Sequence, residues 1–560
     1  MSSPEIEQLI RKRVGELPLL YNFAKKLGFR EILSKHIKPH GNEKFPTVDT
    51  LMLLVYNLAG GRQPLYELEE WVLKLDSRPL GYRSFETKIF NDDRFGRALD
   101  KLYYADRASL TTQIALNTVR ATRLNLEQVN NDSTTLKAFG KIPGKIKSGL
   151  FLARGHSKDH RPDLKQLVYN LTISADGAVP VHFKTYPGNR TDDTTHIETW
   201  NTLCSIAGRA NFLYVADCKV CTDTQLSYIT SRGGRVVTIM PDTWKESERF
   251  KESLRTARKA KSIVWHRPIP NFPERRETFS RFRGNHHTLK RQYPIYWFHS
   301  TEKKKRDRLS REQRMQKAEY ALTQLIGKLN YRKLKTETQI LERVGKILDQ
   351  YKVEPFYHIN LMKVKESYCA QAGKGRPGKH TRYVTRYKMI YSLAWTRKDK
   401  VLKNEQRLDG IFPLVCTDIN LSAKEALVSY KYQPRLEKRF CQLKKDLVAA
   451  PLLFKKIERL EAMMSLLFMA LILQAVIERE VRQGMKHSRL EAIPVYPEHR
   501  LAYHPTTAII FDRFQDLSTH FLVRGDIVVK EYRDPLTDLQ KEILSLLNIP
   551  EQSYWERFLQ

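Results

Sequence analysis

The stretch "QLVYNLTISADGAVPVHFKTY" (Gln166–Tyr186) decides the fold. Its first half alternates apolar and polar side chains, the two-residue period of a strand with one buried face. Gly177 then turns the chain into a second such run, which predicts a β-hairpin. Just upstream, "LEQVNND" (126–132) is also strand-like and ends at Asp132. These three runs predict one side of a β-sheet.

The chain beyond this hairpin alternates helices and strands. A helical stretch covers roughly 193–207, and "NFLYVAD" (211–217) is a short buried strand that ends at Asp217. Another helix and the strand "RVVTIMP" (235–241) follow. The order predicts an α/β core. Asp132 and Asp217 are each expected at the end of a strand, which suits a site at the sheet edge.

Five segments are expected along the chain. Residues 1–125 read as helical, with a helix start at Ser3-Pro4. They predict an N-terminal DNA-binding domain, although a purely structural helical unit fits nearly as well. The other segments, in order, are 126–241 (first part of the core), 242–408 (an insertion domain), 409–485 (the rest of the core) and 486–560 (a C-terminal segment).

The insertion domain departs from the α/β pattern. Short β-like pieces lead into a charged helix from about Leu309, and then into the Gly- and Lys-rich loop "GKGRPGKHTRY" (373–383). Against DNA, that loop would contact phosphate. Trp244 and Trp265 could stack on a base, but packing within the insertion's own core explains them better. "DGIFPLVCTD" (409–418) then resumes as a buried strand.

Charge and composition restrict the partner and the compartment. The 560 residues carry 97 Lys and Arg against 62 Asp and Glu, a net charge of +35. Nucleic acid is the expected partner, and a soluble basic protein without a polyanionic partner is the alternative. Six cysteines in so long a chain indicate no disulfide framework, so we expect a cytoplasmic, nucleoid-associated protein. The apolar run 462–480 contains Ser465 and Gln474, so no membrane span is expected.

A basic protein that acts on phosphodiesters needs carboxylates for metal. Mg²⁺ prefers carboxylate oxygens, and two ions can hold the attacking and leaving oxygens of an in-line displacement. Asp132 and Asp217 at strand ends and Glu437 in "YKYQPRLEKRFCQLKKDL" (430–447) fit that need. Each acid alone is a weak candidate, because most of the 62 acids only keep the protein soluble.

Two other clusters could bind metal. "CKVC" (218–221) has the spacing of half a zinc site, but no second such pair completes it. "HSKDHRPD" (156–163) offers histidines and aspartates, yet such clusters are mostly solvated loops. We expect a metal in neither cluster.

Several motifs in order resemble the insertion-sequence transposases with an Asp-Asp-Glu (DDE) triad, of the IS-sixteen-thirty-four type in the IS-four-like superfamily. That group is marked by Tyr-x2-Arg-x3-Glu-x6-Lys around the glutamate. The resemblance covers nearly the whole chain. Its motifs are "GELPLLYNFAKKLGF", "QPLYELEEW", "NDDRFGRALDKLY", "NDSTT", "GHSKDHRPDLKQLV", "YPGNRTDDTT", "YVADC", "DGIFPLVCTDINLSAKEALVSYK", "LEKRFCQLK" and "HPTTAIIFDRF".

The resemblance implies a ribonuclease-H-like core interrupted by the insertion domain, with a helical N-terminal domain and a helical C-terminal part. It implies that Asp132, Asp217 and Glu437 are catalytic and hold two Mg²⁺, with Mn²⁺ as a substitute. The expected activity is Mg-dependent strand cleavage and strand transfer at terminal inverted repeats, with target DNA as a second partner and a homodimer in the DNA complex. A silent DNA-binding derivative and a stand-alone nuclease of the same fold are the alternatives.

The signature around the glutamate matches incompletely. Tyr430, Glu437 and Lys444 are seven residues apart, which predicts one helix face. The arginine position holds Gln433, and Pro434 predicts a kink or a new helix start there. Tyr430, Lys444, Arg435 and Lys438 are the expected DNA-binding residues.

Overall fold

The computed structural model describes residues 7–61, 63–82, 84–86, 88–138, 150–155, 164–190, 195–269, 272–331, 334–446, 456–525 and 527–555. The chain forms two compact units. Unit 1 comprises Met1–Thr238 and Leu427–Gln560, and unit 2 comprises Ile239–Ala426. Both units mix helices and strands, so the protein belongs to the α/β class. The segment 409–426, expected in the core, therefore groups with unit 2.

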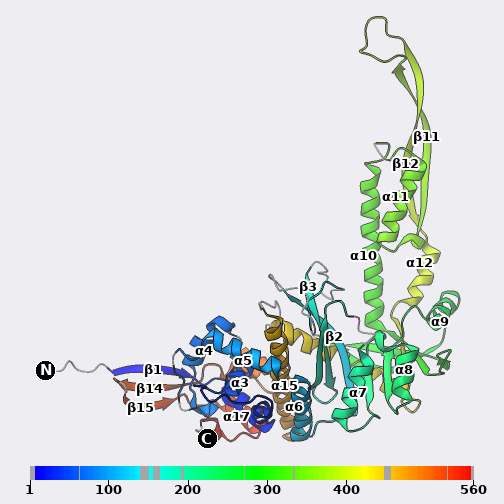
Figure 1. Ribbon diagram of the computed structural model, residues 1–560. Coiled ribbons are helices and arrows are strands. Elements are labelled where there is room, and N and C mark those ends of the chain that lie inside the picture. Colours follow the sequence, from blue (N-terminus) through cyan, green and yellow to red (C-terminus); the bar gives the residue numbers. More distant parts are fainter. Residues whose placement is uncertain are drawn as a thin grey trace. The chain divides into compact units, whose positions relative to one another are not determined.

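Within unit 1 the strands have the order β4-β3-β2-β5-β6, and β2 and β3 lie side by side in Figure 1. The antiparallel strands β2 (Gln128–Ala138), β3 (Lys165–Ser174) and β4 (Pro180–Pro187) come first in the chain. The strands β5 (Leu213–Ala216) and β6 (Arg235–Ile239) run parallel to β2. The helices α7 (His196–Ala207) and α8 (Asp223–Thr230) connect them.

The strand β2 is longer than its sequence pattern suggests. The prediction that this strand ends at Asp132 is wrong, because β2 continues to Ala138 and pairs with β3 along that whole length. The polar run "NDSTT" hides the strand in the sequence, since Asn131, Ser133 and Thr134 are polar but buried. Asp132 therefore lies within a strand.

The N-terminal part of unit 1 is built mainly of helices. Their bounds are α1 (Leu17–Lys26), α2 (Phe29–His36), α3 (Thr47–Tyr56), α4 (Leu68–Lys74), α5 (Asp92–Tyr104) and α6 (Arg107–Thr122), with a π-helix η1 (Asn57–Gly61) and 3₁₀ turns η2 (Leu65–Glu67) and η3 (Arg78–Leu80). Asn91 caps α5 and Asp106 caps α6, each by accepting a backbone hydrogen bond.

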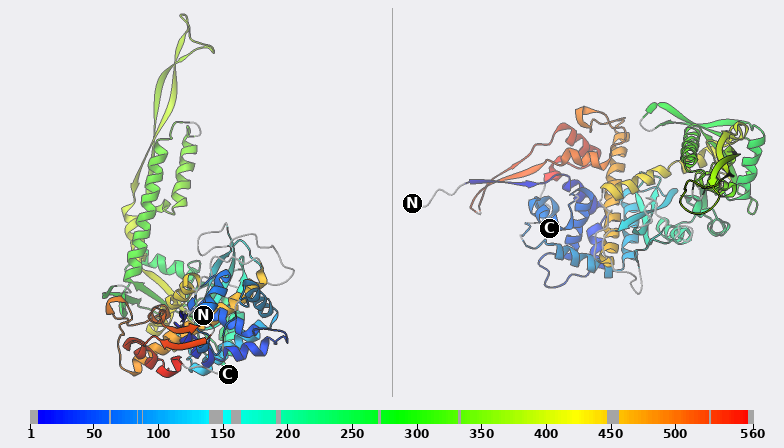
Figure 2. Two further views of the ribbon diagram at one scale, coloured as in Figure 1. Left: turned by 90° about the vertical axis from the view of Figure 1, so that its left-hand side faces the viewer. Right: turned by 90° about the horizontal axis from the view of Figure 1, so that it is seen from above.

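Both ends of the chain contribute strands that the helical predictions missed. The strand β1 (Glu7–Arg13) pairs antiparallel with β14 (Ser518–Arg524), which pairs with β15 (Ile527–Arg533) (Figure 2). The predicted helix start at Ser3-Pro4 lies outside the described residues. The partner strand of β1 lies about 500 residues away in the chain, so no local sequence pattern predicts this sheet.

The helix α15 (Ile457–His487) is the core of unit 1 (Figure 1). By length and composition it could cross a membrane, but 94% of its most apolar window is buried inside the fold. Its polar residue Gln474 is also buried; its Nε2 donates to the carbonyl oxygen of Ala59 at 2.7 Å. Gln474, the polar residue that interrupts the apolar run, therefore links α15 to η1 by a hydrogen bond.

The remaining elements of unit 1 surround this core. They are η5 (Cys218–Val220), α14 (Gln433–Cys441), the π-helix η8 (Gln442–Asp446), η9 (Pro497–His499), α16 (Thr507–Phe514), α17 (Asp538–Leu546) and α18 (Glu551–Trp555). The helix α13 (Ala423–Tyr430) contains the boundary between the two units.

Within unit 2 the strands have the order β13-β10-β8-β7, with β9 paired to β10. The strands are β7 (Lys261–Ile269), β8 (Phe272–Phe282), β9 (His286–His287), β10 (Pro294–Ser300) and β13 (Ile411–Cys416), and the helices are α9 (Lys245–Thr256) and α12 (Asp399–Glu405), with turns η6 (Glu354–Phe356) and η7 (Gln406–Leu408). Trp265 stacks on Phe279 with ring centroids 5.3 Å apart, so it packs within this sheet.

A helical pair and a long hairpin form a second core in unit 2. The helix α10 (Thr301–Ile326) starts eight residues before the predicted Leu309, because Ser300 caps it by accepting from the Lys303 amide. It packs with α11 (Glu337–Gln350) on the base of the hairpin β11 (Tyr357–Gln371) and β12 (Tyr383–Arg397). The hairpin extends past the ends of both helices (Figures 1 and 2).

Candidate functional site

Asp132 and Asp217 are brought together by the parallel pairing of β2 and β5. In that ladder Asn130 lies opposite Val215. Two residues further along the two strands come Asp132 and Asp217. Side chains two residues apart on a strand project from the same face. The register therefore places the two aspartates level with each other on adjacent strands.

The backbone holds both aspartates in defined positions. Asp217 follows the end of β5 and caps η5, and its Oδ1 accepts a hydrogen bond from the Lys219 amide at 3.0 Å. Its own carbonyl accepts from the Thr238 hydroxyl on β6 at 2.6 Å. The Oδ1 of Asp132 accepts from the Ser133 amide at 2.7 Å. Both side chains are half-buried, so they can reach a ligand.

The predicted single helix face through Tyr430, Glu437 and Lys444 is wrong. Tyr430 ends α13, Glu437 lies in α14, and Lys444 lies in the π-helix η8. The seven-residue spacing therefore crosses three helical segments, and the wider turns of a π-helix interrupt the 3.6-residue period. The predicted new helix start is confirmed, because α14 begins at Gln433 with Pro434 in its first turn.

Gln433 links the start of α14 to β2 by hydrogen bonds next to Asp132. Its Nε2 donates to the carbonyl oxygen of Asn131 at 2.9 Å. Its Oε1 accepts from the side-chain amide of Asn130, also at 2.9 Å. Gln128 extends this network, since its Nε2 donates to Asn130 Oδ1 at 2.9 Å and to the Ser429 carbonyl at 3.0 Å. The glutamate-bearing helix is thus hydrogen-bonded to the strand that carries the first aspartate.

The pKa of Tyr430 is affected by the negative charges of this site. Burial is the largest cause that raises the pKa of its hydroxyl above the usual value. The negative charges of Asp217, Cys218, Asp132 and Glu437, in that order, raise this pKa further. All three predicted acids are therefore near enough to act on one phenol, although they come from β2, the end of β5 and α14.

His196 is a residue of this site that sequence reasoning missed. Its side chain is buried at the start of α7, and its Nδ1 lies 2.9 Å from the Tyr214 hydroxyl. Its Nε2 lies 3.9 Å from Asp217 Oδ1. The only hint in the sequence is its place directly after the motif "YPGNRTDDTT". Tyr214 thus orients the His196 ring, and that ring lies next to Asp217, the second aspartate.

The donor set of the site is carboxylate oxygen, which suits Mg²⁺ and Mn²⁺. Within the described ranges, however, no three His, Cys, Asp or Glu side chains are grouped tightly enough to hold a metal ion. The three acids therefore lie near Tyr430. Within the described residues, their carboxylates do not form a complete set of metal ligands. Cys218 and Cys221 are not joined in a disulfide, and the cluster 156–163 lies outside the described residues.

The predicted DNA-contacting cations lie on both segments that follow Tyr430. Arg435 and Lys438 are on α14, where Lys438 is exposed and Arg435 half-buried. Lys444 is half-buried in η8. None of these placements tests DNA contact, which stays a prediction.

Unit 2 carries a separate basic surface, the hairpin β11–β12. Between 357 and 397 the sequence has nine Lys and Arg and one Glu, a net charge of +8 (9 − 1). Aromatic and apolar side chains are exposed among these cations, including Tyr383 and Tyr387. Lys365 Nζ lies over the Tyr387 ring, 4.2 Å from its centroid. Four cations, Lys374, Arg376, Lys379 and Arg382, lie in the connection between the strands.

Comparisons with known proteins give two findings. A family model described as a domain of unknown function, DUF4277, matches residues 9–116. A solved structure of the piggyBac transposase synaptic complex with hairpin DNA is similar over 49% of this chain, at 10% sequence identity and a TM-score of 0.29. The chain covers 61% of that transposase chain, less than two thirds of its length. The search of curated proteins gives no match.

Proposed function

We propose that this protein is a DNA transposase of the DDE class, encoded by an insertion sequence. It binds the inverted repeats at the ends of its element, cuts one strand there, and joins the freed 3′-OH to target DNA. Asp132, Asp217 and Glu437 are the proposed metal ligands and catalytic residues. We expect it to act as a homodimer on DNA in the bacterial nucleoid.

The observation that carries this proposal is that three acids from distant parts of the chain lie near one tyrosine, Tyr430. Asp132 and Asp217 are level on neighbouring parallel strands. The charges of both aspartates and of Glu437 act on Tyr430. The strand order β4-β3-β2-β5-β6, an antiparallel meander with two strands parallel to its first, supports the proposed ribonuclease-H-like core. If these acids served only in surface salt bridges, nothing would require all three to lie near the same tyrosine.

Each residue has a role that follows from its chemistry. Bound by the three carboxylates, Mg²⁺ would supply an activated oxygen nucleophile and stabilise the leaving oxygen. Tyr430 is half-buried and its pKa is raised, so at neutral pH it stays a neutral hydrogen-bond donor that can orient a phosphate oxygen. Lys444 provides a positive charge for the phosphate backbone. Gln433 keeps the glutamate helix on β2 while these groups act.

DNA is the proposed partner because positive charge dominates both units. The net charge is +35, and the hairpin β11–β12 alone contributes +8. A two-stranded β-ribbon fits the major groove of DNA, and exposed aromatic rings among cations suit contact with nucleic acid. We propose that this hairpin contacts duplex DNA and that the helices of residues 1–125 bind the inverted repeats.

The experiment is a strand-cleavage assay on duplexes taken from the DNA that flanks the reading frame. Wild type should nick them with Mg²⁺ or Mn²⁺ and not with EDTA. Asp132→Asn, Asp217→Asn and Glu437→Gln should each reduce nicking to background while retaining DNA binding. Glu248→Gln, an exposed glutamate in α9, is the matched control and should nick normally.

The same assay separates the alternatives. Metal-dependent nicking followed by joining to a target plasmid supports the transposase. Nicking without joining indicates a nuclease, and binding without nicking indicates a DNA-binding derivative. Full activity in all three acid variants would overturn the assignment of the site.

A further inference from the structure

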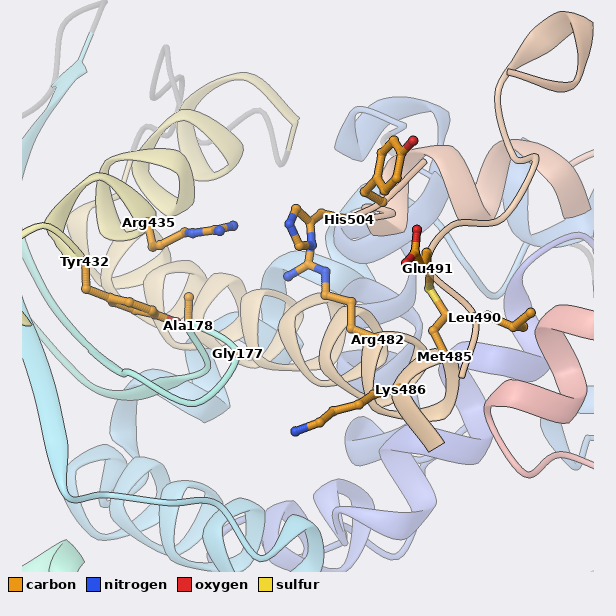
Figure 3. A pocket seen from close by; sticks show the side chains of 11 residues that line it. Gly177, Ala178, Tyr432, Arg435, Arg482, Met485, Lys486, Leu490, Glu491 and His504 are labelled. Carbon is orange, nitrogen blue, oxygen red and sulfur yellow. The ribbon is translucent and has the colours of Figure 1, made fainter. Parts of the chain in front are cut away.

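A cationic cavity lies against α14, the helix that carries Glu437. Its volume is about 410 Å³, and Figure 3 shows the side chains that line it. The start of α14, the C-terminal half of α15, the turn between β3 and β4, and residues 490–504 enclose it. Arg435, Arg482, Lys486 and His504 bring the basic groups, and Glu491 is the acid of the lining. We call this cavity the Arg435 pocket.

Positive charge in the Arg435 pocket exceeds the negative charge that balances it. Arg482 donates to the Pro505 carbonyl at 3.0 Å, and its ion pair with Glu478 is long, at 3.5 Å. Glu478 is closer to Arg439, at 2.9 Å, so one carboxylate is shared by two guanidinium groups. The buried Nε of Arg482 has no hydrogen-bond partner within the described structure.

Arg435 and His504 strengthen the same conclusion. Figure 3 shows the Arg435 side chain extended towards His504, with the guanidinium group of Arg482 beside that ring. Across the described ranges, no carboxylate forms an ion pair with Arg435. Burial lowers the pKa of His504, and the positive charges of Arg435, Arg482 and Lys438 lower it further. Such a gathering of cations is stable when an anion joins it.

The size and walls of the pocket define the anion. Ala178, Tyr432, Met485 and Leu490 provide apolar surface beside the cations. A volume of about 410 Å³ falls in the range of small-molecule sites, about 300–1,000 Å³. Guanidinium groups match phosphate oxygens in pairs, and the apolar walls suit a sugar. This chemistry fits a phosphate with its attached sugar.

We propose that the Arg435 pocket binds one phosphate of the DNA backbone together with its sugar. This inference rests on the proposed function. Arg435 and Glu437 are two residues apart on α14, about 200° around the helix axis at 100° per residue. The phosphate in the pocket is therefore not the one that is cut, but another one that holds α14 from its opposite side.

The test is a phosphate-neutralisation scan in the full chain carrying Asp132→Asn, which prevents cleavage. Duplexes from the element end carry a neutral methylphosphonate at one position each, and their affinities are measured by fluorescence anisotropy. One position should weaken binding by about 10-fold to 100-fold, as expected for a lost charge-assisted contact. With Arg435→Gln, neutralising that same position should have almost no further effect.

The matched control is Arg489→Gln, an exposed cation just after α15 that does not line the pocket. It should leave the effect of every methylphosphonate unchanged. The proposal is overturned if no position loses its effect in Arg435→Gln, provided that the variant unfolds at the wild-type temperature.

A second arm distinguishes DNA from a free nucleotide. Calorimetric titrations use inorganic phosphate and thymidine 3′,5′-bisphosphate. Arg435-dependent binding of either probe, with no coupled position in the duplex, assigns the pocket to a free ligand and overturns the DNA proposal. Because both arms measure binding alone, a protein that fails to nick DNA but shows a coupled phosphate supports the pocket and rejects only the catalytic assignment.

Discussion

Gln433 donates a hydrogen bond to the backbone carbonyl of Asn131 across 2.9 Å, although 302 residues separate them in the chain. That carbonyl lies one residue before Asp132, and Gln433 lies four residues before Glu437. One amide therefore sets the position of two proposed metal ligands relative to each other.

Replacing Gln433 should weaken the site without unfolding the protein. Gln433→Leu leaves the Asn131 carbonyl and the Asn130 amide without their partner, which costs about 1–3 kcal/mol of stability. We expect cleavage to fall about 10-fold to 100-fold, with a higher Mg²⁺ requirement, as for partners that orient metal ligands. Gln433→Glu keeps an acceptor for Asn130 and should lose less. Cleavage by Gln433→Leu at the wild-type rate and Mg²⁺ requirement would contradict this role.

The support behind Asp217 can be tested by removing one oxygen atom. Tyr214→Phe deletes the hydroxyl that holds His196 Nδ1, so the ring near Asp217 loses its fixed orientation. We expect an approximately 10-fold loss of cleavage rate at a cost of about 1 kcal/mol in stability. Tyr228→Phe is the control, because that hydroxyl bonds Asn201 at the surface of α7 and α8. Equal cleavage by the two variants would show that Tyr214 does not help to orient His196 and Asp217 for catalysis.

The hairpin β11–β12 should set part of the salt dependence of DNA binding. Changing Lys374, Arg376, Lys379 and Arg382 to Gln removes up to four phosphate contacts. The slope of log K against log salt should then decrease by up to about 3.6, at about 0.9 per contact. The control changes four exposed lysines of unit 2 outside the hairpin to Gln: Lys317, Lys328, Lys335 and Lys346. An equal decrease in the control would show that the hairpin has no special role.

Glu43 should make the helical part of unit 1 sensitive to acid. Burial alone would raise its pKa, but hydrogen bonds from Lys101 and Thr47 outweigh burial and lower the pKa to about 2. The folded pKa is below the unfolded value of 4.5, so the stabilisation is complete above about pH 5 and is lost as the pH falls towards 2.

Glu43→Gln should therefore unfold at lower urea concentration at pH 7, with a smaller difference from wild type at pH 3. Glu70→Gln removes an exposed glutamate that pairs with Lys74, and it should match wild type at both pH values. A constant difference between Glu43→Gln and wild type across this range would show that the charge of Glu43 does not matter.

The sequence predicted what depends on local pattern. The hairpin at Gly177, the buried strand before Asp217 and the helix start at Pro434 all have short-range signals, and the structure has each of them. What it missed depends on distant partners. β1 exists because β14 pairs with it, and β2 continues past Asp132 because polar side chains such as Asn131 find buried partners on β3.

The site shows the same division. The three acids and Arg435 follow from residue types and a family resemblance, whereas His196 and the other basic residues around Arg435, such as Arg482, emerge only from the fold. A buried histidine and scattered arginines have no distinctive spacing in a chain with 97 basic residues. Only the packing of α7 on β5, and of α14 against α15, distinguishes them from the others.

Unit 2 separates the third acid from the first two in time as well as in sequence. Glu437 follows Asp217 by 220 residues (437 − 217), most of which form unit 2. A ribosome that adds about 5–20 residues per second needs about 10–40 s for that interval. Nascent or prematurely ended chains therefore carry both aspartates but not the glutamate. Synthesis itself delays a complete set of acids until unit 2 has been made. Under the proposed function, unfinished chains would therefore lack the third metal ligand and would not cut the DNA of the cell.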